Sequence, residues 1–132
     1  MSRDFIEVLP GRWIVHARQA VLTGIEVLGG PTLRLVFDTG LLVQIIGEWR
    51  ASAGSPRTGP DVDLSSGIER LGAGILSLVL FESGAVRLVL SDGIVISARA
   101  ANGTEIKSAL PGEYEWSASE TGVSRLRSKA LE

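Results

Sequence analysis

Two segments of the chain, residues 21–47 and 74–100, carry the same pattern of apolar and polar positions and align at a constant offset without a gap. Arg34-Leu35-Val36 falls on Arg87-Leu88-Val89, and most apolar positions around these triplets also match. Short apolar stretches broken by glycine-containing turns are typical of β-strands. We therefore predict a mainly β protein built on an internal pseudo-repeat.

Each segment predicts a three-stranded antiparallel meander. Asp92-Gly93 between two apolar runs is a strong hairpin signal, because both residues can adopt positive φ. Two such meanders would cover each other as a sandwich or a flattened barrel. The expected strands are 22–28, 33–38 and 41–46 in the first half, and 75–81, 86–91 and 94–99 in the second.

The pairing expected in the first hairpin places its outward side chains. Glu26 falls opposite Arg34, which predicts a cross-strand ion pair. With a two-residue turn at Thr39-Gly40, Val36, Val43 and Ile45 share the face of Arg34. Both faces of the meander are then partly apolar, so either the two meanders cover each other or a second chain covers the outer face. We expect a homodimer on this ground.

The rest of the chain adds short elements to a single domain, residues 1–132. Residues 5–19 predict one or two short strands, and residues 51–60 (ASAGSPRTGP) predict a mobile loop. Residues 63–71 predict a short helix between the halves, since Asp63 or Ser65 could cap it. The tail, residues 124–132, is expected to be frayed or only weakly docked.

Composition and charge narrow the classes of function. A chain of 132 residues with 45% hydrophobic residues and a net charge of −2 can bury a sizeable core. Its Lys and Arg residues are scattered, which argues against nucleic acid as a partner. It has no cysteine, which excludes disulfides and thiol chemistry. The lack of a long apolar stretch argues against a membrane partner and favours a cytoplasmic location.

The residues typical of enzymes do not form a recognisable constellation. His16 is the only histidine and lies in an apolar run, so we interpret it as a strand residue rather than a catalytic base. Asp61-Val62-Asp63 lacks the further oxygen ligands of a calcium loop. Paired carboxylates for glycoside hydrolysis stay open. We expect no catalytic residue, no metal and no cofactor.

The candidate interaction residues are either arginines and acids in the repeat or large aromatic residues. Arg34 and Arg87 are equivalent positions that could hold a carboxylate or phosphate, or could simply carry solvated charge. Glu26 stands where the second half has Val79, so the halves differ there. The aromatic residues have polar groups suited to interfaces, although core packing is their commoner role. The full set is Arg34, Arg87, Glu26, Trp49, Tyr114 and Trp116.

Four segments, in order along residues 20–118, together resemble a known family. They are the strand Gly40–Ile45, the step Leu71-Gly72, the hairpin at 82–93 (ESGAVRLVLSDG) and the box Tyr114-Glu115-Trp116. The chain resembles small uncharacterised bacterial domains, common in actinobacteria, that carry a Tyr-Glu-Ala-Trp box after a similar hairpin. The resemblance implies no established activity, although some such domains are suspected of acting as immunity-like partners of toxins.

These patterns together predict a non-enzymatic protein-interaction or binding module, of immunity-like character. The alternative is a small-molecule-binding β-barrel with Arg34 or Arg87 at its mouth, and a hydrolase is less favoured. A closed apolar interior would favour the interaction module, whereas an internal cavity of about a few hundred Å³ would favour the ligand-binding barrel.

Overall fold

The computed structural model describes residues 6–18, 20–28, 32–54, 71–101, 103–119 and 124–128. All regular structure within these ranges is β-strand. The predicted helix, apart from Leu71, and residues 55–60 of the predicted loop lie outside the described residues. The strands are β1 (Ile6–Leu9), β2 (Arg12–Val15), β3 (Leu22–Leu28), β4 (Thr32–Phe37), β5 (Leu42–Ile46), β6 (Arg50–Ala53), β7 (Ile75–Phe81), β8 (Ala85–Leu90), β9 (Ile94–Arg99), β10 (Glu105–Leu110), β11 (Tyr114–Ala118) and β12 (Ser124–Ser128). Strands such as β4, β8, β10 and β11 alternate between buried and more exposed side chains.

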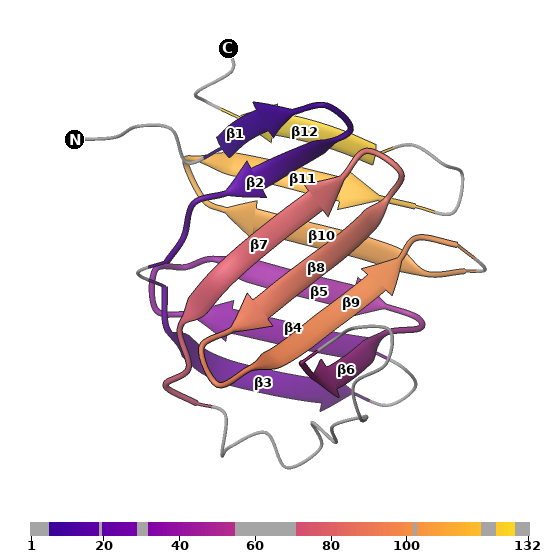
Figure 1. Ribbon diagram of the computed structural model, residues 1–132. Coiled ribbons are helices and arrows are strands. Elements are labelled where there is room, and N and C mark those ends of the chain that lie inside the picture. The colour runs from indigo at the N-terminus through magenta and orange to yellow at the C-terminus, as the bar shows by residue number, and fades with distance from the viewer. Residues whose placement is uncertain are drawn as a thin grey trace.

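The strands form two antiparallel sheets that pack face to face as a sandwich (Figure 1). Sheet I has the strand order β1-β2-β7-β8-β9-β6, and sheet II has the order β12-β11-β10-β5-β4-β3. The predicted mainly β sandwich is therefore confirmed. Each sheet has six strands rather than three. In sheet I, β1, β2 and β6 flank the run β7-β8-β9, and in sheet II β10, β11 and β12 extend one side of the run β5-β4-β3.

The runs β3-β4-β5 and β7-β8-β9 have the same pairing register. Leu22 pairs with Phe37 ahead of a bulge in β3, and Ile75 pairs with Leu90 ahead of a bulge at the equivalent place in β7. A β-bulge bends its strand and increases the local twist. The two halves therefore curve at the same point.

The halves meet where equivalent residues face each other. Val21 forms an antiparallel bridge with Gly74, its own counterpart in the repeat. Beside it, the Leu22 amide donates to the Ala73 carbonyl at 2.8 Å. With the halves exchanged, the Ile75 amide donates to the Ala20 carbonyl at 3.2 Å. A pseudo-twofold axis therefore passes between Val21 and Gly74.

Each half contributes one strand to the sheet of the other half. After β5 the chain crosses to sheet I, where Arg50 of β6 pairs with Ser97 of β9. After β9 it crosses back to sheet II, where Lys107 of β10 pairs with Gln44 of β5. Two sequence predictions need correction here. Residues 51–53 belong to β6 rather than to a loop, and residues 124–128 form β12, which pairs along its length with β11.

The turn between β4 and β5 reverses one prediction about which face β5 presents. The Phe37 amide donates to the Leu41 carbonyl, and the Gly40 amide donates to the Phe37 carbonyl, both at 2.9 Å. The turn thus has three residues instead of two, with Gly40 at a φ of +93°. One extra residue moves every β5 side chain to the other face. Val43 and Ile45 therefore point into the core, not outward with Arg34.

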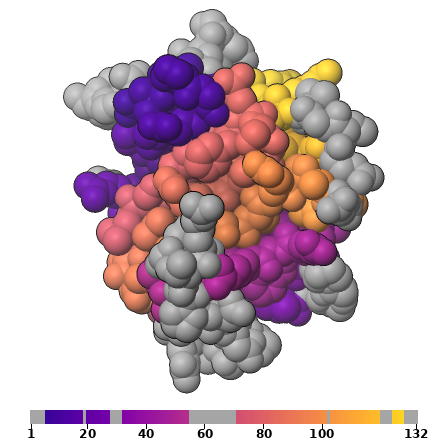
Figure 2. Space-filling model, turned by 45° about the vertical axis from the view of Figure 1, so that its right-hand side comes forward, coloured from indigo at the N-terminus to yellow at the C-terminus, as the bar shows by residue number. Residues whose placement is uncertain are grey.

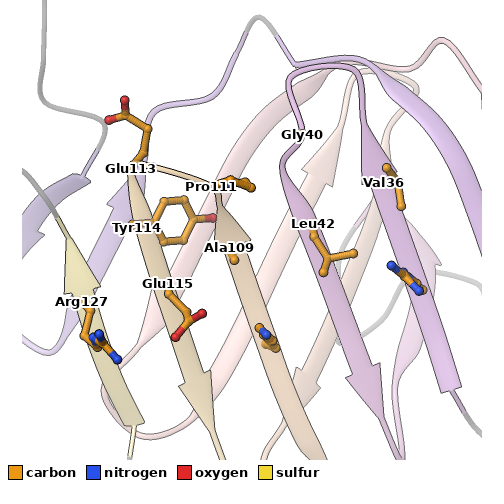
Figure 3. Close-up of a pocket in the computed structure, with 12 residues that line it drawn as sticks. Val36, Gly40, Leu42, Ala109, Pro111, Glu113, Tyr114, Glu115 and Arg127 are labelled. Carbon is orange, nitrogen blue, oxygen red and sulfur yellow. The ribbon is translucent and has the colours of Figure 1, made fainter.

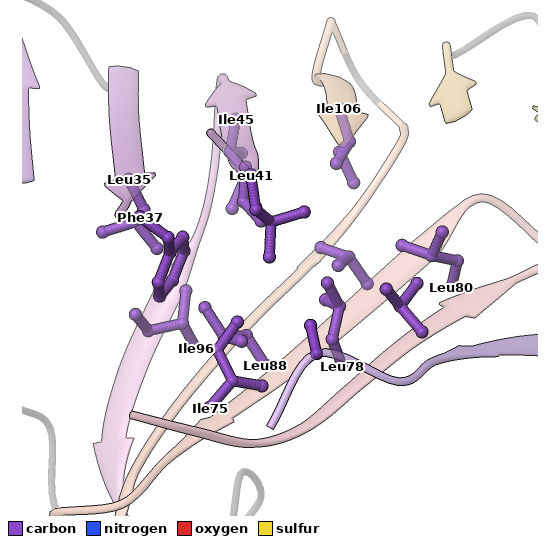
Figure 4. Packing of buried hydrophobic residues seen from close by; sticks show 14 of the residues in the cluster. Leu35, Phe37, Leu41, Ile45, Ile75, Leu78, Leu80, Leu88, Ile96 and Ile106 are labelled. Atoms are coloured by element: carbon purple, nitrogen blue, oxygen red, sulfur yellow. The ribbon is translucent and has the colours of Figure 1, made fainter. Parts of the chain in front are cut away.

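One apolar core fills the space between the sheets (Figure 4). Its fully buried members include Phe37 and Ile45 of sheet II and Leu78 and Leu88 of sheet I. The β1–β2 hairpin extends sheet I beside β7 and forms the indigo lobe at the upper left of Figure 2. Since large side chains occupy the interior, surfaces that could bind a ligand have to be sought on the outer faces.

Candidate functional site

Two hollows open on the outer face of sheet II. The larger has a volume of about 760 Å³ and lies at the end of the strands near Gly40 and Pro111 (Figure 3). The second, of about 480 Å³, lies toward the other end, near Ile46 and Ser119. Lys107 lines both hollows, so they are neighbouring parts of one depression.

The backbone register arranges the outward side chains of sheet II in rows that cross all six strands. Neighbouring strands lie about 4.8 Å apart, so each row extends over roughly 24 Å. From β3 to β12 the middle row is Glu26, Arg34, Gln44, Lys107, Ser117 and Arg125, and the row toward Pro111 is Gly24, Val36, Leu42, Ala109, Glu115 and Arg127. We call these twelve residues the groove face.

The centre of the groove face is apolar. Val36, Leu42 and Ala109 follow one another on β4, β5 and β10, and each is half-buried. In Figure 3 they lie side by side, with Glu115 and Arg127 on the adjoining strands. An apolar centre with a charged surround is the usual anatomy of a protein–protein interface.

Four cations stand on this face, and they have few partners of their own. Arg34 Nε lies 3.9 Å from Glu26 Oε1, which confirms the predicted cross-strand pair. Both side chains are about half exposed, at 46% and 52%, so this pair contributes little to stability. Lys107, Arg125 and Arg127 form no ion pair with any residue that the structure describes. Their charge is therefore available to a binding partner.

The two equivalent arginines are not brought together. Arg34 lies on the outer face of sheet II, between Glu26 and Gln44. Arg87 lies on the outer face of sheet I, where its guanidinium carbon is 5.7 Å from the centre of the Phe81 ring. The two side chains point away from opposite sides of the sandwich, so they do not form a joint clamp for one anion.

Tyr114 and Trp116 belong to the core rather than to an exposed binding surface. Strand alternation turns both toward the inner face of sheet II, where their exposed fractions are 4% and 0%. The Tyr114 hydroxyl lies 2.6 Å from Ser108 Oγ, and Trp116 Nε1 donates to Ser124 Oγ at 2.9 Å. Burial raises the pKa of the Tyr114 phenol, and the hydrogen bond with Ser108 opposes part of this rise. Both side chains anchor β11 to its neighbours.

Trp49 lies apart from the groove face. It is half-buried, packs against the core and lines a hollow of about 320 Å³ at the β6–β9 edge of sheet I. Arg50 and Ser97 line the same hollow, and they pair across β6 and β9 as Lys107 and Gln44 pair across β10 and β5. This hollow is thus the pseudo-symmetric counterpart of the 480 Å³ hollow in sheet II.

His16 forms a hydrogen bond at the β1–β2 hairpin, with its Nε2 atom 2.8 Å from Glu7 Oε1. Both side chains are about half exposed, and neither lines the hollows of sheet II. A base with an orienting acid needs in addition a reacting group and a place for substrate, so this pair by itself does not make a catalytic site. In the described part of the chain, no three His, Cys, Asp or Glu side chains are grouped to hold a metal ion.

Sequence reasoning missed the third of the groove face that β10 and β12 supply. Lys107, Arg125 and Arg127 reach it through strand pairings between segments far apart in the chain. The alternation of polar and apolar residues over Glu105–Leu110 is only an incomplete signal for β10, because a serine stands at the inward position 108.

Comparison of the chain with models of protein families, with curated proteins and with solved structures gives no match. The resemblance to small actinobacterial-type domains stays a prediction. None of the described segments is a helix of the length and apolarity needed to cross a membrane.

Proposed function

We propose that this protein is a non-enzymatic interaction module that binds a protein partner through the groove face. One observation carries the proposal: both larger hollows open on this single face, around an apolar centre surrounded by charged side chains. The mixed charge, with arginines and a lysine beside glutamates, suits the mixed charge of a protein surface better than a uniform polyanion.

The filled interior supports a protein partner over the small-molecule alternative. Trp116 and Phe37, the two largest of the fully buried side chains, lie between the sheets. A small-molecule site typically encloses most of its ligand. The hollows of sheet II lie instead on an outer surface that six strands share.

Peptide selection tests this proposal without a known partner. A phage-displayed library of random peptides is selected on the wild-type protein, and the enriched peptides are then measured against two variants. Val36→Asp places a charge in the apolar centre of the groove face. Val89→Asp makes the same change at the equivalent, also half-buried position of sheet I. We expect binding to fall about tenfold or more for Val36→Asp alone, since a buried charge there is unpaired.

A second matched pair covers the case in which either aspartate variant fails to fold, as judged by circular dichroism. Arg34→Glu and Arg87→Glu reverse equivalent exposed charges on the two outer faces. Peptides that bind both groove-face variants as tightly as wild type would overturn the proposal, and so would a selection that enriches no peptide.

A further inference from the structure

We infer that the partner of the groove face is a second copy of this chain, packed about a twofold axis that runs parallel to the strands between β5 and β10. This inference rests on the proposed function and names its partner. It starts from the order of charges along the middle row, which has Glu26 at the β3 edge and Arg125 at the β12 edge.

The axis exchanges β3 with β12, β4 with β11 and β5 with β10. Glu26 of one copy then faces Arg125 of the other, and symmetry makes this contact twice. At the centre, Gln44 faces Lys107, so its amide oxygen can accept a hydrogen bond from the ammonium group. In the neighbouring row Leu42 faces Ala109, which joins the apolar centres of the two copies.

Side-chain size also matches under this operation. Arg34 of one copy faces Ser117 of the other, and the small residues Ser117 and Ser119 line the 480 Å³ hollow. A long guanidinium side chain thus meets a recess rather than another long side chain. Glu115 of one copy faces Val36 of the other, and it keeps Arg127 as its cross-strand neighbour within its own sheet.

A twofold axis perpendicular to the strands that runs along the middle row is excluded by charge. It would place Glu26 against Glu26 and Arg34 against Arg34 of the second copy. Like charges placed directly opposite each other at an interface cost several kcal/mol. The axis parallel to the strands avoids both contacts and replaces them with opposite charges.

Sheet I has acidic and basic ends as well, but these are engaged within the chain. Its equivalent row runs from Glu7 on β1 to Arg50 on β6. Glu7 is held by His16 at 2.8 Å, and Arg50 also has an interaction of its own. Glu26 is held less closely, at 3.9 Å from Arg34, so the complementary charges that are more open to a second copy lie on sheet II.

The size of the groove face sets the expected affinity. Its two rows each extend over roughly 24 Å and lie roughly 7 Å apart along the strands. This footprint is at or below the lower end for stable complexes, which bury about 800 Å² on each partner. We expect a reversible dimer with a dissociation constant of about tens of micromolar, weakened by salt.

Charge exchange tests the geometry of the dimer. Sedimentation velocity over a concentration series is measured for wild type, Glu26→Arg, Arg125→Glu and the double variant. Each single reversal creates two like-charge contacts and should weaken the dimer about tenfold or more. The double variant restores opposite charges and should recover the wild-type dimer. Arg87→Glu, on sheet I, is the matched control and should leave the dimer unchanged.

A wild-type chain that stays monomeric at several times the expected constant would overturn this inference. A double variant that dissociates as readily as the single ones would overturn it too. The peptide selection separates the two proposals. If selected peptides still need Val36 while the chain is monomeric, the face binds another protein and only the partner assigned here is wrong.

Discussion

We predict that the buried Tyr114 makes the free energy of unfolding decrease as pH rises above 10, and the chain is well suited to measuring this effect. It is the only tyrosine of the chain, so phenolate absorbance reports one group. Its ring is buried in the core, and its hydroxyl lies 2.6 Å from Ser108 Oγ. Burial disfavours the charged phenolate and holds the pKa of Tyr114 well above the ordinary value of 10.0.

The size of the effect follows from proton linkage. Above pH 10 the phenol of the unfolded chain is ionised, whereas the native state keeps its proton. The native state then binds more protons than the unfolded state, so the free energy of unfolding decreases as pH rises. The contribution of Tyr114 is fully present below pH 10. Its loss is on the order of 1 kcal/mol at pH 11 and about 3 kcal/mol at pH 12.

Urea unfolding at a series of pH values, followed by tryptophan fluorescence, measures this loss. The wild type should lose stability between pH 10 and pH 12 faster than Tyr114→Phe does, by the amounts above. Other titrating groups affect both proteins equally and cancel in the comparison. Phenolate absorbance should appear only together with unfolding. A simple titration near pH 10 in the folded protein, or equal pH slopes for the two proteins, would refute the reasoning.

The phenylalanine variant needs one correction because it leaves Ser108 without a partner. An unpaired buried hydroxyl costs about 1–3 kcal/mol. The double variant Ser108→Ala/Tyr114→Phe removes both polar groups and should recover most of that loss at neutral pH. It should also lack the alkaline slope, which separates the titration from the hydrogen bond.

Two further predictions concern single contacts. Gly47→Ala should lower the free energy of unfolding by about 3 kcal/mol, since Gly47 has a φ of +129° and an added Cβ would collide with Thr104. Gly93→Ala is the control: Gly93 has a φ of +90° but open space around it, so this variant should lose only about 1 kcal/mol. Equal losses for the two variants in chemical denaturation would contradict this account. Trp116→Phe removes the hydrogen bond to Ser124 and should speed amide hydrogen exchange in β12 more than in β7, whereas unchanged exchange in β12 would show that the bond does not hold this strand.

The meander strands could be predicted from sequence because their signals are local. The observed bounds of β3, β7 and β9 agree with the expected ones, and the bounds of β4, β5 and β8 differ by one residue. The face of β5 could not be predicted in this way. It depends on whether the turn that ends at Gly40 has two residues or three, and the sequence Asp-Thr-Gly permits both.

The missing strands show where local patterns lose their information. In β10 the inward position 108 holds a serine, which breaks the apolar alternation. That serine is acceptable in the core only because the Tyr114 hydroxyl, on the next strand, pairs with it. In β6 the sequence Arg-Ala-Ser-Ala has low strand propensity, and its strand forms through pairing with β9 of the other half. Both elements, and with them part of the groove face, depend on contacts that no local pattern contains.

The same dependence explains why the two halves differ at the position that matters for binding. Glu26 and Val79 are equivalent in the repeat. However, β3 is an edge strand, whereas β7 pairs with β2 on the side that would otherwise be a sheet edge. Val79 lies beside Ile14 and is only 3% exposed, while the side chain of Glu26 is 52% exposed. An ionised carboxylate is disfavoured at the buried position and accepted at the edge. The β1–β2 hairpin thus occupies in sheet I the place that is the β3 edge in sheet II. Glu26, the acidic residue that the proposed dimer requires, stands at this β3 edge.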